Sequence, residues 1–331
     1  MTFSASVLDI DARAEVERIV EVLRRQVGQV LRRRGAVIAL SGGIDSSVVA
    51  GLSARAFGPQ RCHGLLMPER DSSASTLALS RSVAEAFDMP YAVEGITPTL
   101  EAIGCYRRRD EAIASVVPGY GPDHKSKIVL PGAEAGADYN LYSLVVERPN
   151  GAIERHRLPL APYLQIVAAT NFKQRIRKTL EYYWADRLHY ACTGTPNRLE
   201  YDQGFFVKNG DGAGDIKPIA HLYKSQVYAL AAELGVPAEV RGRAPTTDTY
   251  SLTQGQDEFY FALPYREMDL CLYGKNHGVD PGEVARATGL REEQVAWVYA
   301  DIDKKRSTTR YLHARPLLVE DPLAGTPGHG D

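Results

Sequence analysis

A short stretch near the N-terminus, Ser41–Ser47, has the residue types of a phosphate-binding loop. It reads Ser-Gly-Gly-Ile-Asp-Ser-Ser, follows the apolar run 36–40 that is typical of a buried strand, and leads into the apolar start of an expected helix at 48–52. Glycines let the backbone approach an anion closely, and the free N–H groups and dipole of a helix N-terminus favour negative charge. The serine hydroxyls add donors, and Asp45 is a candidate Mg2+ ligand. The loop lacks the lysine of a Walker loop, so the sequence predicts a different phosphate site.

The strand, loop and helix together resemble the pyrophosphatase loop of the N-type ATP pyrophosphatases, which cleave ATP between its α and β phosphates. A glycine-rich turn that holds no ligand is the alternative, but the complete pattern favours ATP. The resemblance implies that ATP contacts the loop and the residue before it, namely Leu40, Ser41, Gly42, Gly43, Ile44, Asp45, Ser46 and Ser47.

The segments around this loop alternate between helix and strand patterns. Apolar residues recur every three or four positions over 11–34, and strand patterns at 63–67 and 91–96 flank an expected helix at 74–87. This β-α-β-α-β order predicts an α/β fold with a doubly wound parallel sheet. In such a fold the ligand lies at the carboxyl ends of the strands.

The alternation breaks between residues 105 and 160, where we expect an insertion. Residues 140–146 and 152–158 have strand patterns, and Arg148–Gly151 between them is a turn signal, so the sequence predicts a β-hairpin. Three arginines, Arg107–Arg109, precede the hairpin. They could bind phosphate, but a solvated run of charge is the preferred interpretation.

The second half of the chain returns to helices with one strand. We expect helices at 172–189 and 223–234, a strand at 190–194, a glycine-rich loop at 209–214, and several short helices within 257–303. There are no internal repeats, so residues 1–320 are expected to form a single domain. A flexible Gly/Pro-rich tail is expected at 321–331.

Bulk composition limits the class of protein. The 331 residues carry a net charge of −2 and are 44% hydrophobic, so no basic excess indicates a nucleic-acid partner. The four cysteines are scattered without a C-x-x-C pair, which argues against a structural zinc site or a disulfide framework. No apolar run reaches membrane-spanning length and the N-terminus lacks a secretory pattern, so we expect a cytoplasmic protein without a membrane partner.

A second set of motifs follows in a fixed order at 171–177, 194–200, 204–212, 215–219, 222–224 and 245–248. Each motif is short, but the six in this order, together with the phosphate loop, resemble the ammonia-dependent NAD synthases from about residue 17 to 273. That family makes NAD from deamido-NAD, ATP and ammonia. The resemblance implies the ATP pyrophosphatase (adenine nucleotide alpha hydrolase-like) fold and a homodimer.

The resemblance also implies roles for individual residues. It gives ATP contacts to Thr195, Lys224 and Thr246, with Asp45 and Lys224 as the catalytic pair and with Asp45 and Glu200 as ligands of Mg2+. It gives deamido-NAD contacts to Arg175, Lys208 and Asp215, and to Lys304 and Lys305 in place of the His-Lys pair of the family. Two alternatives stay open: Asp215 could be a turn cap, and Arg175 could be a solvated helix charge.

Adenylation explains why these residue types occur together. A carboxylate cannot be amidated directly, because its oxygen is a poor leaving group. Attack on the α-phosphorus of ATP releases pyrophosphate, and an amine then displaces AMP, so the protein must position the reactants and neutralise a triphosphate. The departures from the family are the insertion, Pro196, Thr247 and the 304–306 segment, and they lie on the acid-substrate side. Adenylation is therefore better supported than the identity of the acid.

Other functions are weighed against NAD synthesis. An adenylating amide ligase of the same fold could act on a different carboxylic acid, and a nucleotide-binding protein could have lost catalysis. Sulfur transfer to tRNA is disfavoured, since the chain has neither a cysteine pair nor a basic excess. The sequence contains no glutaminase module, so the amine is expected to be free ammonia or ammonia from a separate glutaminase.

Overall fold

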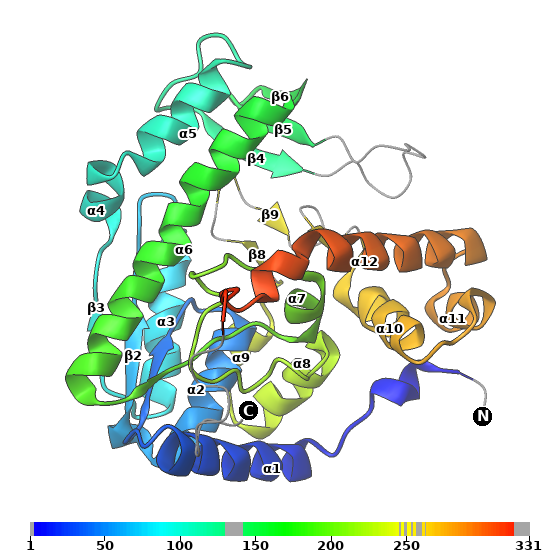
Figure 1. Cartoon of the computed structure of the whole chain (residues 1–331). Coiled ribbons are helices and arrows are strands. Elements are labelled where there is room, and N and C mark those ends of the chain that lie inside the picture. Colours follow the sequence, from blue (N-terminus) through cyan, green and yellow to red (C-terminus); the bar gives the residue numbers. More distant parts are fainter. Residues whose placement is uncertain are drawn as a thin grey trace.

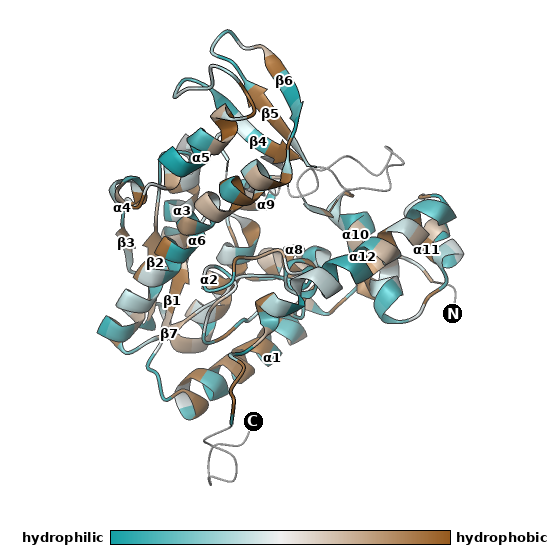
Figure 2. Ribbon diagram, turned by 45° about the horizontal axis from the view of Figure 1, so that its top comes forward, coloured by the Kyte–Doolittle hydropathy of each residue, from teal (hydrophilic) through white to brown (hydrophobic). Residues whose placement is uncertain are grey.

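A four-stranded parallel sheet forms the centre of the protein. In the computed structural model, which describes residues 3–129, 142–244, 246–247, 250–252, 254–255, 260–261 and 263–320, the strand order is β3-β2-β1-β7. The strands are β1 (Ala36–Ala39), β2 (Cys62–Leu66), β3 (Tyr91–Val93) and β7 (Ala191–Cys192). Ala36 pairs with Cys62 on one side and Ala191 on the other, so β1 is central. Figure 2 colours β1 and β2 mostly brown, as expected for strands buried on both faces.

Helices cover both faces of this sheet, which confirms the predicted doubly wound α/β fold. Ile38 points into one core with α1 (Ala12–Arg24), α2 (Ile44–Phe57), α3 (Ala74–Ala86) and α8 (Lys224–Glu233). Its neighbour Val37 points into the opposite core with α4 (Thr97–Ala102), α5 (Cys105–Ala114) and α6 (Leu160–Leu188). This two-residue alternation is the reason that one strand supports two helical layers. None of the described helices is both long and apolar enough to cross a membrane.

The insertion is ordered where the structure describes it, and it contains more than the predicted hairpin. β5 (Ser143–Glu147) and β6 (Ile153–Arg157) form the hairpin, and Gly151 takes a positive φ of 81° in its turn. A third strand, β4 (Lys125–Val129), pairs antiparallel with β5 and was not predicted. Residues 140 and 141 of the predicted strand lie outside the described residues.

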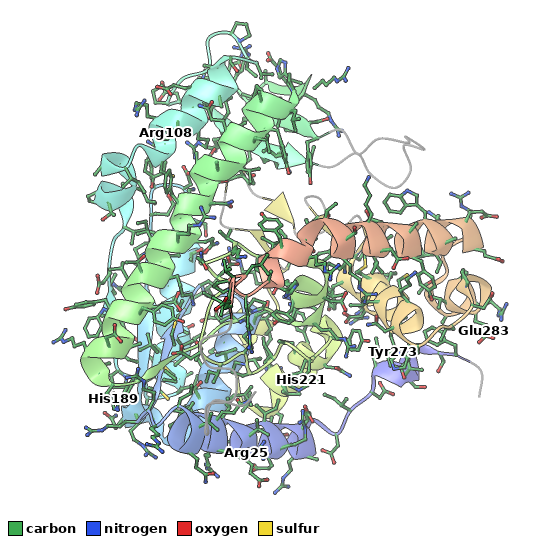
Figure 3. The ribbon with its side chains drawn as sticks, viewed as in Figure 1. Arg25, Arg108, His189, His221, Tyr273 and Glu283 are labelled. Carbon is green, nitrogen blue, oxygen red and sulfur yellow. The ribbon has the colours of Figure 1, made fainter. Side chains whose placement is uncertain are left out.

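One boundary prediction around the insertion was wrong, and one interpretation held only in part. The long helix α6 begins at Leu160 and not at 172. Pro162 is compatible with this start because it lies in the first turn, where a backbone N–H has no acceptor within the helix. The arginine run 107–109 belongs to α5, and the preferred interpretation of solvated charge holds for two of the three residues but not for Arg109, which is only 4% exposed. Arg107 and Arg108 are exposed, and Figure 3 labels Arg108 on α5.

A helical C-terminal layer packs against α8, to one side of the sheet (Figure 1). It consists of α10 (Tyr265–Asn276), α11 (Pro281–Thr288) and α12 (Glu292–His313), whose core also includes residues of η1 (Ala5–Leu8) and α7 (Arg198–Gln203). Short helices were predicted here, but α12 runs for 22 residues, ten beyond the predicted region. The short elements η2 (Arg25–Val30), η3 (Pro59–Arg61), α9 (Ala238–Arg241), β8 (Thr246–Thr247) and β9 (Gln254–Gly255) complete the described fold. The predicted tail at 321–331 lies outside the described residues.

A buried carboxylate on α10 holds the N-terminus of α8. Asp269 is fully buried, and its Oδ1 and Oδ2 accept hydrogen bonds from the backbone N–H of Lys224 (3.1 Å) and of Ser225 (2.7 Å). Burial raises the pKa of Asp269 to about 6, and the two donors only partly offset this effect. The C-terminal layer thereby fixes where α8 starts, and with it the position of Lys224.

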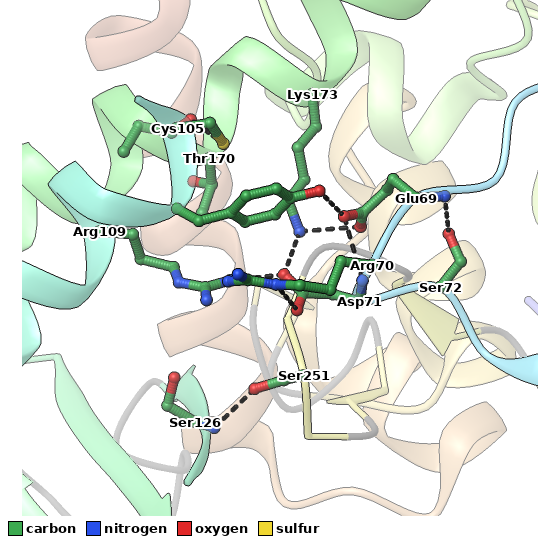
Figure 4. A network of polar contacts seen from close by, with 12 residues as sticks. Glu69, Arg70, Asp71, Ser72, Cys105, Arg109, Ser126, Thr170, Lys173 and Ser251 are labelled. Atoms are coloured by element: carbon green, nitrogen blue, oxygen red, sulfur yellow. Dashed lines mark hydrogen bonds and ion pairs between the residues drawn. The ribbon is translucent and has the colours of Figure 1, made fainter. Parts of the chain in front are cut away.

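A second buried network connects the loop after β2 to the helices on the other face (Figure 4). Lys173 of α6 lies 2.9 Å from Glu69 Oε1 and 2.6 Å from Asp71 Oδ2. Arg109 of α5 also pairs with Asp71, and Tyr106 donates a 2.7 Å hydrogen bond to Glu69. Burial opposes the charge of Asp71, but Lys173 and Arg109 lower its pKa below the ordinary value. These two cations therefore hold both carboxylates of the loop.

Replacing Asp269 by Ala should destabilise the protein by about 2–4 kcal/mol, because two buried N–H groups of α8 lose their acceptors. Urea denaturation would measure the free energy of unfolding. Asp303→Ala is the matched control, since Asp303 lies on α12 in an exposed pair with Lys275 and its loss should cost under about 1 kcal/mol. Equal stability of the two variants would contradict the capping role of Asp269.

Replacing Lys173 by Met should cost about 3–5 kcal/mol at neutral pH, because Glu69 and Asp71 would keep buried charges without this cation. Adding Glu69→Gln should recover part of the loss. The pKa of Asp71 is lower in the folded than in the unfolded state. The stabilisation by its charge is therefore complete above its ordinary pKa and is lost as the pH falls through the lowered pKa. The difference from the wild type should therefore shrink below about pH 4. Arg107→Met, which breaks an exposed pair with Glu111, should change stability by less than about 1 kcal/mol.

Candidate active site

The predicted phosphate loop joins the end of β1 to the start of α2. Gly42 has a φ of 69°, and a Cβ there would lie 2.8 Å from Leu79 Cβ and 3.0 Å from Thr76 O of α3. A residue with a side chain is thus excluded both by conformation and by the approach of α3. Gly43 is the N-cap of α2, so the first N–H groups of that helix lie at the loop.

The serine hydroxyls of the loop are held by the backbone of the same turn. Ser46 and Ser47 donate to the carbonyl of Gly43 at 3.1 and 2.7 Å, and the hydroxyl oxygens of Ser41 and Ser46 lie 3.1 Å apart. Ser41 and Ser46 also line the cleft described below, whereas Ser47 is fully buried and does not. Ser47 therefore shapes the turn, and its predicted ATP contact stays a prediction.

Asp45, in the first turn of α2, is the centre of a charged cluster at the loop. Its Oδ2 lies 2.5 Å from Lys224 Nζ, and its Oδ1 accepts a 3.1 Å hydrogen bond from Asn197 Nδ2. Burial opposes the charge of Lys224, but Asp45 and Glu200 raise its pKa, so the ammonium stays protonated. Side chains from three separate segments thus meet at one carboxylate.

Glu200 is positioned by the helix cap of α7. Asn197 accepts a hydrogen bond from the N–H of Glu200, and Glu200 Oε2 accepts one from the N–H of Asn197, which is a capping box. Burial and the nearby charge of Asp45 raise the pKa of Glu200, while Lys224 opposes this shift. The structure therefore brings the two predicted metal ligands together in one cluster with Lys224.

These residues form the floor of a cleft of about 900 Å3, at the upper end of the range typical of small-molecule sites. It lies between the carboxyl ends of β1 and β2, one face of α6 and the C-terminal half of α12 (Figure 1). Most of the predicted site residues line it, namely Leu40, Ser41, Gly42, Gly43, Ile44, Asp45, Ser46, Arg175, Thr195, Glu200, Lys208, Lys224, Lys304 and Lys305. The cleft therefore unites the phosphate loop with the residues of the second motif set.

Several predicted substrate contacts have partners within the protein. Lys208 donates to the carbonyls of Tyr311 (2.7 Å) and Ala314 (3.2 Å) at the end of α12. Arg175 donates to the carbonyl of Lys208 at 3.2 Å, so the two residues support each other at the cleft wall. Lys305 pairs with Asp301 at 2.6 Å, and burial lowers its pKa, whereas Lys304 is exposed.

Asp215 and Thr246 are not placed in the cleft by the described structure. The carboxylate of Asp215 accepts hydrogen bonds from the N–H of Cys192 (2.8 Å) and from the hydroxyl of Tyr182 (3.3 Å). The carboxylate therefore accepts from the backbone of β7 and not from its own turn, and its substrate contact stays a prediction. Thr246 contributes backbone to β8, but its side chain lies outside the described residues.

Sequence reasoning missed three polar residues of the site region. Asn197, which is 1% exposed, binds Asp45, and the Asn-x-x-Glu cap signature would have found it. Lys178 and Glu181 of α6 also line the cleft and pair at 2.6 Å, with Lys178 Nζ 3.1 Å from the carbonyl of Thr193. The sequence around Lys178 and Glu181 did not distinguish them from the solvated charges of the same helix, because their burial depends on the packing of β7 against α6.

Comparison with known proteins places this arrangement in a family. The chain matches the NAD synthase family over residues 15–116 and 150–311. It is 59% identical over 320 residues to the NH(3)-dependent NAD(+) synthetase of Rhizobium meliloti (strain 1021), covering 97% of this chain and 96% of that protein. It is 35% identical over 285 residues to the enzyme of the same name from Thermotoga neapolitana, covering 83% and 91%.

Two solved structures share the fold. NMN synthetase from Francisella tularensis has a TM-score of 0.63 at 21% identity and covers 94% of this chain and 99% of its own. The NH3-dependent NAD synthetase from Campylobacter jejuni subsp. jejuni NCTC 11168 has a TM-score of 0.61 at 20% identity, with 94% and 100% covered. The family match, the relatives and the shared fold lead to one conclusion: this chain belongs to the NAD synthase family.

Proposed function

We propose that this protein is an ammonia-dependent NAD synthase. It adenylates the carboxylate of deamido-NAD with ATP, releases pyrophosphate, and amidates the intermediate with ammonia to give NAD and AMP. The observation that carries the proposal is the 59% identity, over nearly the whole length of both chains, to a protein named for that reaction. The cluster of Asp45, Lys224 and Glu200 below the phosphate loop supports the adenylation step.

The first step forms a bond between a carboxylate oxygen and the α-phosphorus of ATP, and breaks the bond between that phosphorus and the β-bridging oxygen. The N–H groups of the loop and the start of α2 bind phosphate oxygens. Lys224, whose ammonium stays charged, stabilises the negative charge that develops on pyrophosphate. In the second step ammonia attacks the activated carbonyl, AMP leaves with the oxygen, and the nitrogen loses a proton.

Mg2+ fits the chemistry of Asp45 and Glu200. Burial and the nearby charge of Asp45 raise the pKa of Glu200, and a divalent cation would relieve the repulsion between the two carboxylates. Within the described residues no group of three His, Cys, Asp or Glu side chains could hold a metal. Mg2+ prefers oxygen ligands, and two carboxylates together with phosphate oxygens and water would complete its coordination shell. The bound ion would neutralise charge on the triphosphate.

The acid side of the cleft is proposed to bind deamido-NAD through Arg175, Lys208 and Lys304, whose charges suit its pyrophosphate and carboxylate. Lys305 is proposed to act there by holding α12 through its pair with Asp301. Ammonia is proposed to come from solution or from a separate glutaminase. The protein is further proposed to act in the cytoplasm and to be a homodimer, as the family resemblance implies.

The reaction itself is the first test. The full-length protein, supplied with ATP, MgCl2, ammonium chloride and deamido-NAD, should form NAD, AMP and pyrophosphate in equal amounts, which chromatography and a coupled pyrophosphate assay would measure. A panel of other carboxylic acids, including nicotinate mononucleotide, serves as the comparison. Absence of NAD at saturating substrates, with pyrophosphate released only by another acid, would show an amide ligase of different specificity.

Substitutions in the charged cluster test the proposed roles. Asp45→Asn and Lys224→Met should each lower kcat for pyrophosphate release by about 10²- to 10³-fold, because the first removes a charged ligand of Mg2+ and the second removes the cation beside the reacting phosphates. The matched control is Lys125→Met, since Lys125 is exposed on β4 and its pair with Glu147 lies at the surface. Circular dichroism would verify folding. Rates in the two cluster variants close to that of the control would remove these residues from catalysis.

A further inference from the structure

The insertion holds a second segment of the chain besides its own hairpin. Ser126 of β4 uses both of its backbone groups for this contact. Its N–H donates to Ser251 Oγ at 2.9 Å, and its carbonyl accepts from the N–H of Leu252 at 3.2 Å. Figure 4 shows the first of these hydrogen bonds. β4 lies within residues 117–149, which the match to the NAD synthase family leaves out, so this contact depends on a part of the chain outside that match.

An aromatic side chain fixes the same segment to the core of the insertion. Tyr250 is 5% exposed and belongs to a buried cluster with apolar side chains of α5, β4, β5 and α6, among them Ile113, Ile128, Leu144 and Ile166. Its hydroxyl group contacts Thr170 of α6. Residues 250–252 are therefore held both by apolar packing and by hydrogen bonds, and β4 takes part in each.

The anchored residues lie between two short strands at the wall of the cleft. β8 pairs antiparallel with β9, with Thr246 opposite Gly255, and these two strands form a sheet separate from the central one. A two-stranded hairpin is only marginally stable on its own. Ala244 before β8 and Tyr250 after it both line the cleft. The place of β8 at this wall therefore depends on the anchor at residues 250–252.

This wall is connected to the phosphate loop through α3. Arg243, three residues before β8, donates a 3.5 Å hydrogen bond to the hydroxyl of Ser73, the N-cap of α3. The next turn of α3 approaches Gly42 of the loop so closely that a Cβ there would lie 3.0 Å from Thr76 O. The segment that the insertion holds therefore lies at the end of the cleft where the triphosphate is proposed to bind. It includes Thr246, for which an ATP contact is predicted.

We propose that the insertion is a positioning element for the ATP site. Ser126 and the cluster around Tyr250 hold residues 250–252, and through them β8, in the arrangement that binds ATP. This inference rests on the proposed function and adds a role for the insertion to it. When only a fraction of the molecules has the wall in place, the apparent affinity for ATP falls by that fraction. Asp45 and Lys224 stand on other elements, so the chemical step at saturating ATP is unaffected.

Ser251→Ala tests this role, because it removes the acceptor of the Ser126 N–H and, unlike Tyr250, Ser251 does not line the cleft. Isothermal titration calorimetry with α,β-methylene-ATP and MgCl2 should show a Kd raised by about 2- to 10-fold, the effect of one lost hydrogen bond. Hydrogen–deuterium exchange of peptides covering 246–255 should become faster. KM for deamido-NAD, and kcat at saturating ATP, should stay within about twofold of the wild type, since the anchor acts on ATP binding alone. Ser251→Thr, which keeps the hydroxyl, should behave like the wild type, and Ser143→Ala, half-buried on β5 and outside the cleft lining, is the control.

An unchanged Kd for the ATP analogue in Ser251→Ala would overturn the proposal, whether or not the exchange of 246–255 becomes faster. An equal rise in KM for deamido-NAD would also contradict it, because the whole cleft would then have loosened. The analogue is not cleaved between its α and β phosphates, so its affinity is measured without the reaction. Failure of the wild-type protein to make NAD would overturn the proposed function and leave this comparison of ATP binding intact.

Discussion

Lys224 carries its ammonium into the interior of the protein, where only nearby carboxylates make a positive charge tolerable. Asp45 supplies the contact at 2.5 Å, and Glu200 lies in the same cluster. The arrangement depends on three elements at once. β1 and α2 present Asp45, the capping box of α7 presents Glu200, and α10 holds the first residue of α8 through Asp269. Any element that moved would leave a buried charge without its partner.

The two long helices give this cluster its surroundings. α6 passes from the insertion across the sheet, and its buried Lys173 holds the loop after β2 through Glu69 and Asp71. α12 closes the opposite side and is held at its end by Lys208. The cleft is therefore bounded by ion pairs and hydrogen bonds that connect distant parts of the chain, and its shape depends on electrostatic compensation as well as on apolar packing.

Local patterns predicted the parts of this structure that local chemistry determines. The glycine pair between an apolar strand and an apolar helix predicted the loop, and the turn Arg148–Gly151 predicted the hairpin. β4 and the start of α6 were not predicted, because β4 is defined by pairing with β5 and the first turns of α6 lack a clear polar face. Lys178 and Asp269 had no signal at all, since charged residues become buried only through partners that are distant in sequence.

The departures from the family pattern and the insertion both contribute residues to the cleft. Pro196 and the 304–305 pair line the cleft together with Tyr142, whereas Asp45 and Lys224 keep the residue types that adenylation requires. A site that must bring an acid to the α-phosphorus tolerates little change near the phosphates, because transition-state stabilisation depends on fixed geometry. Remote contacts alter affinity without disturbing that geometry.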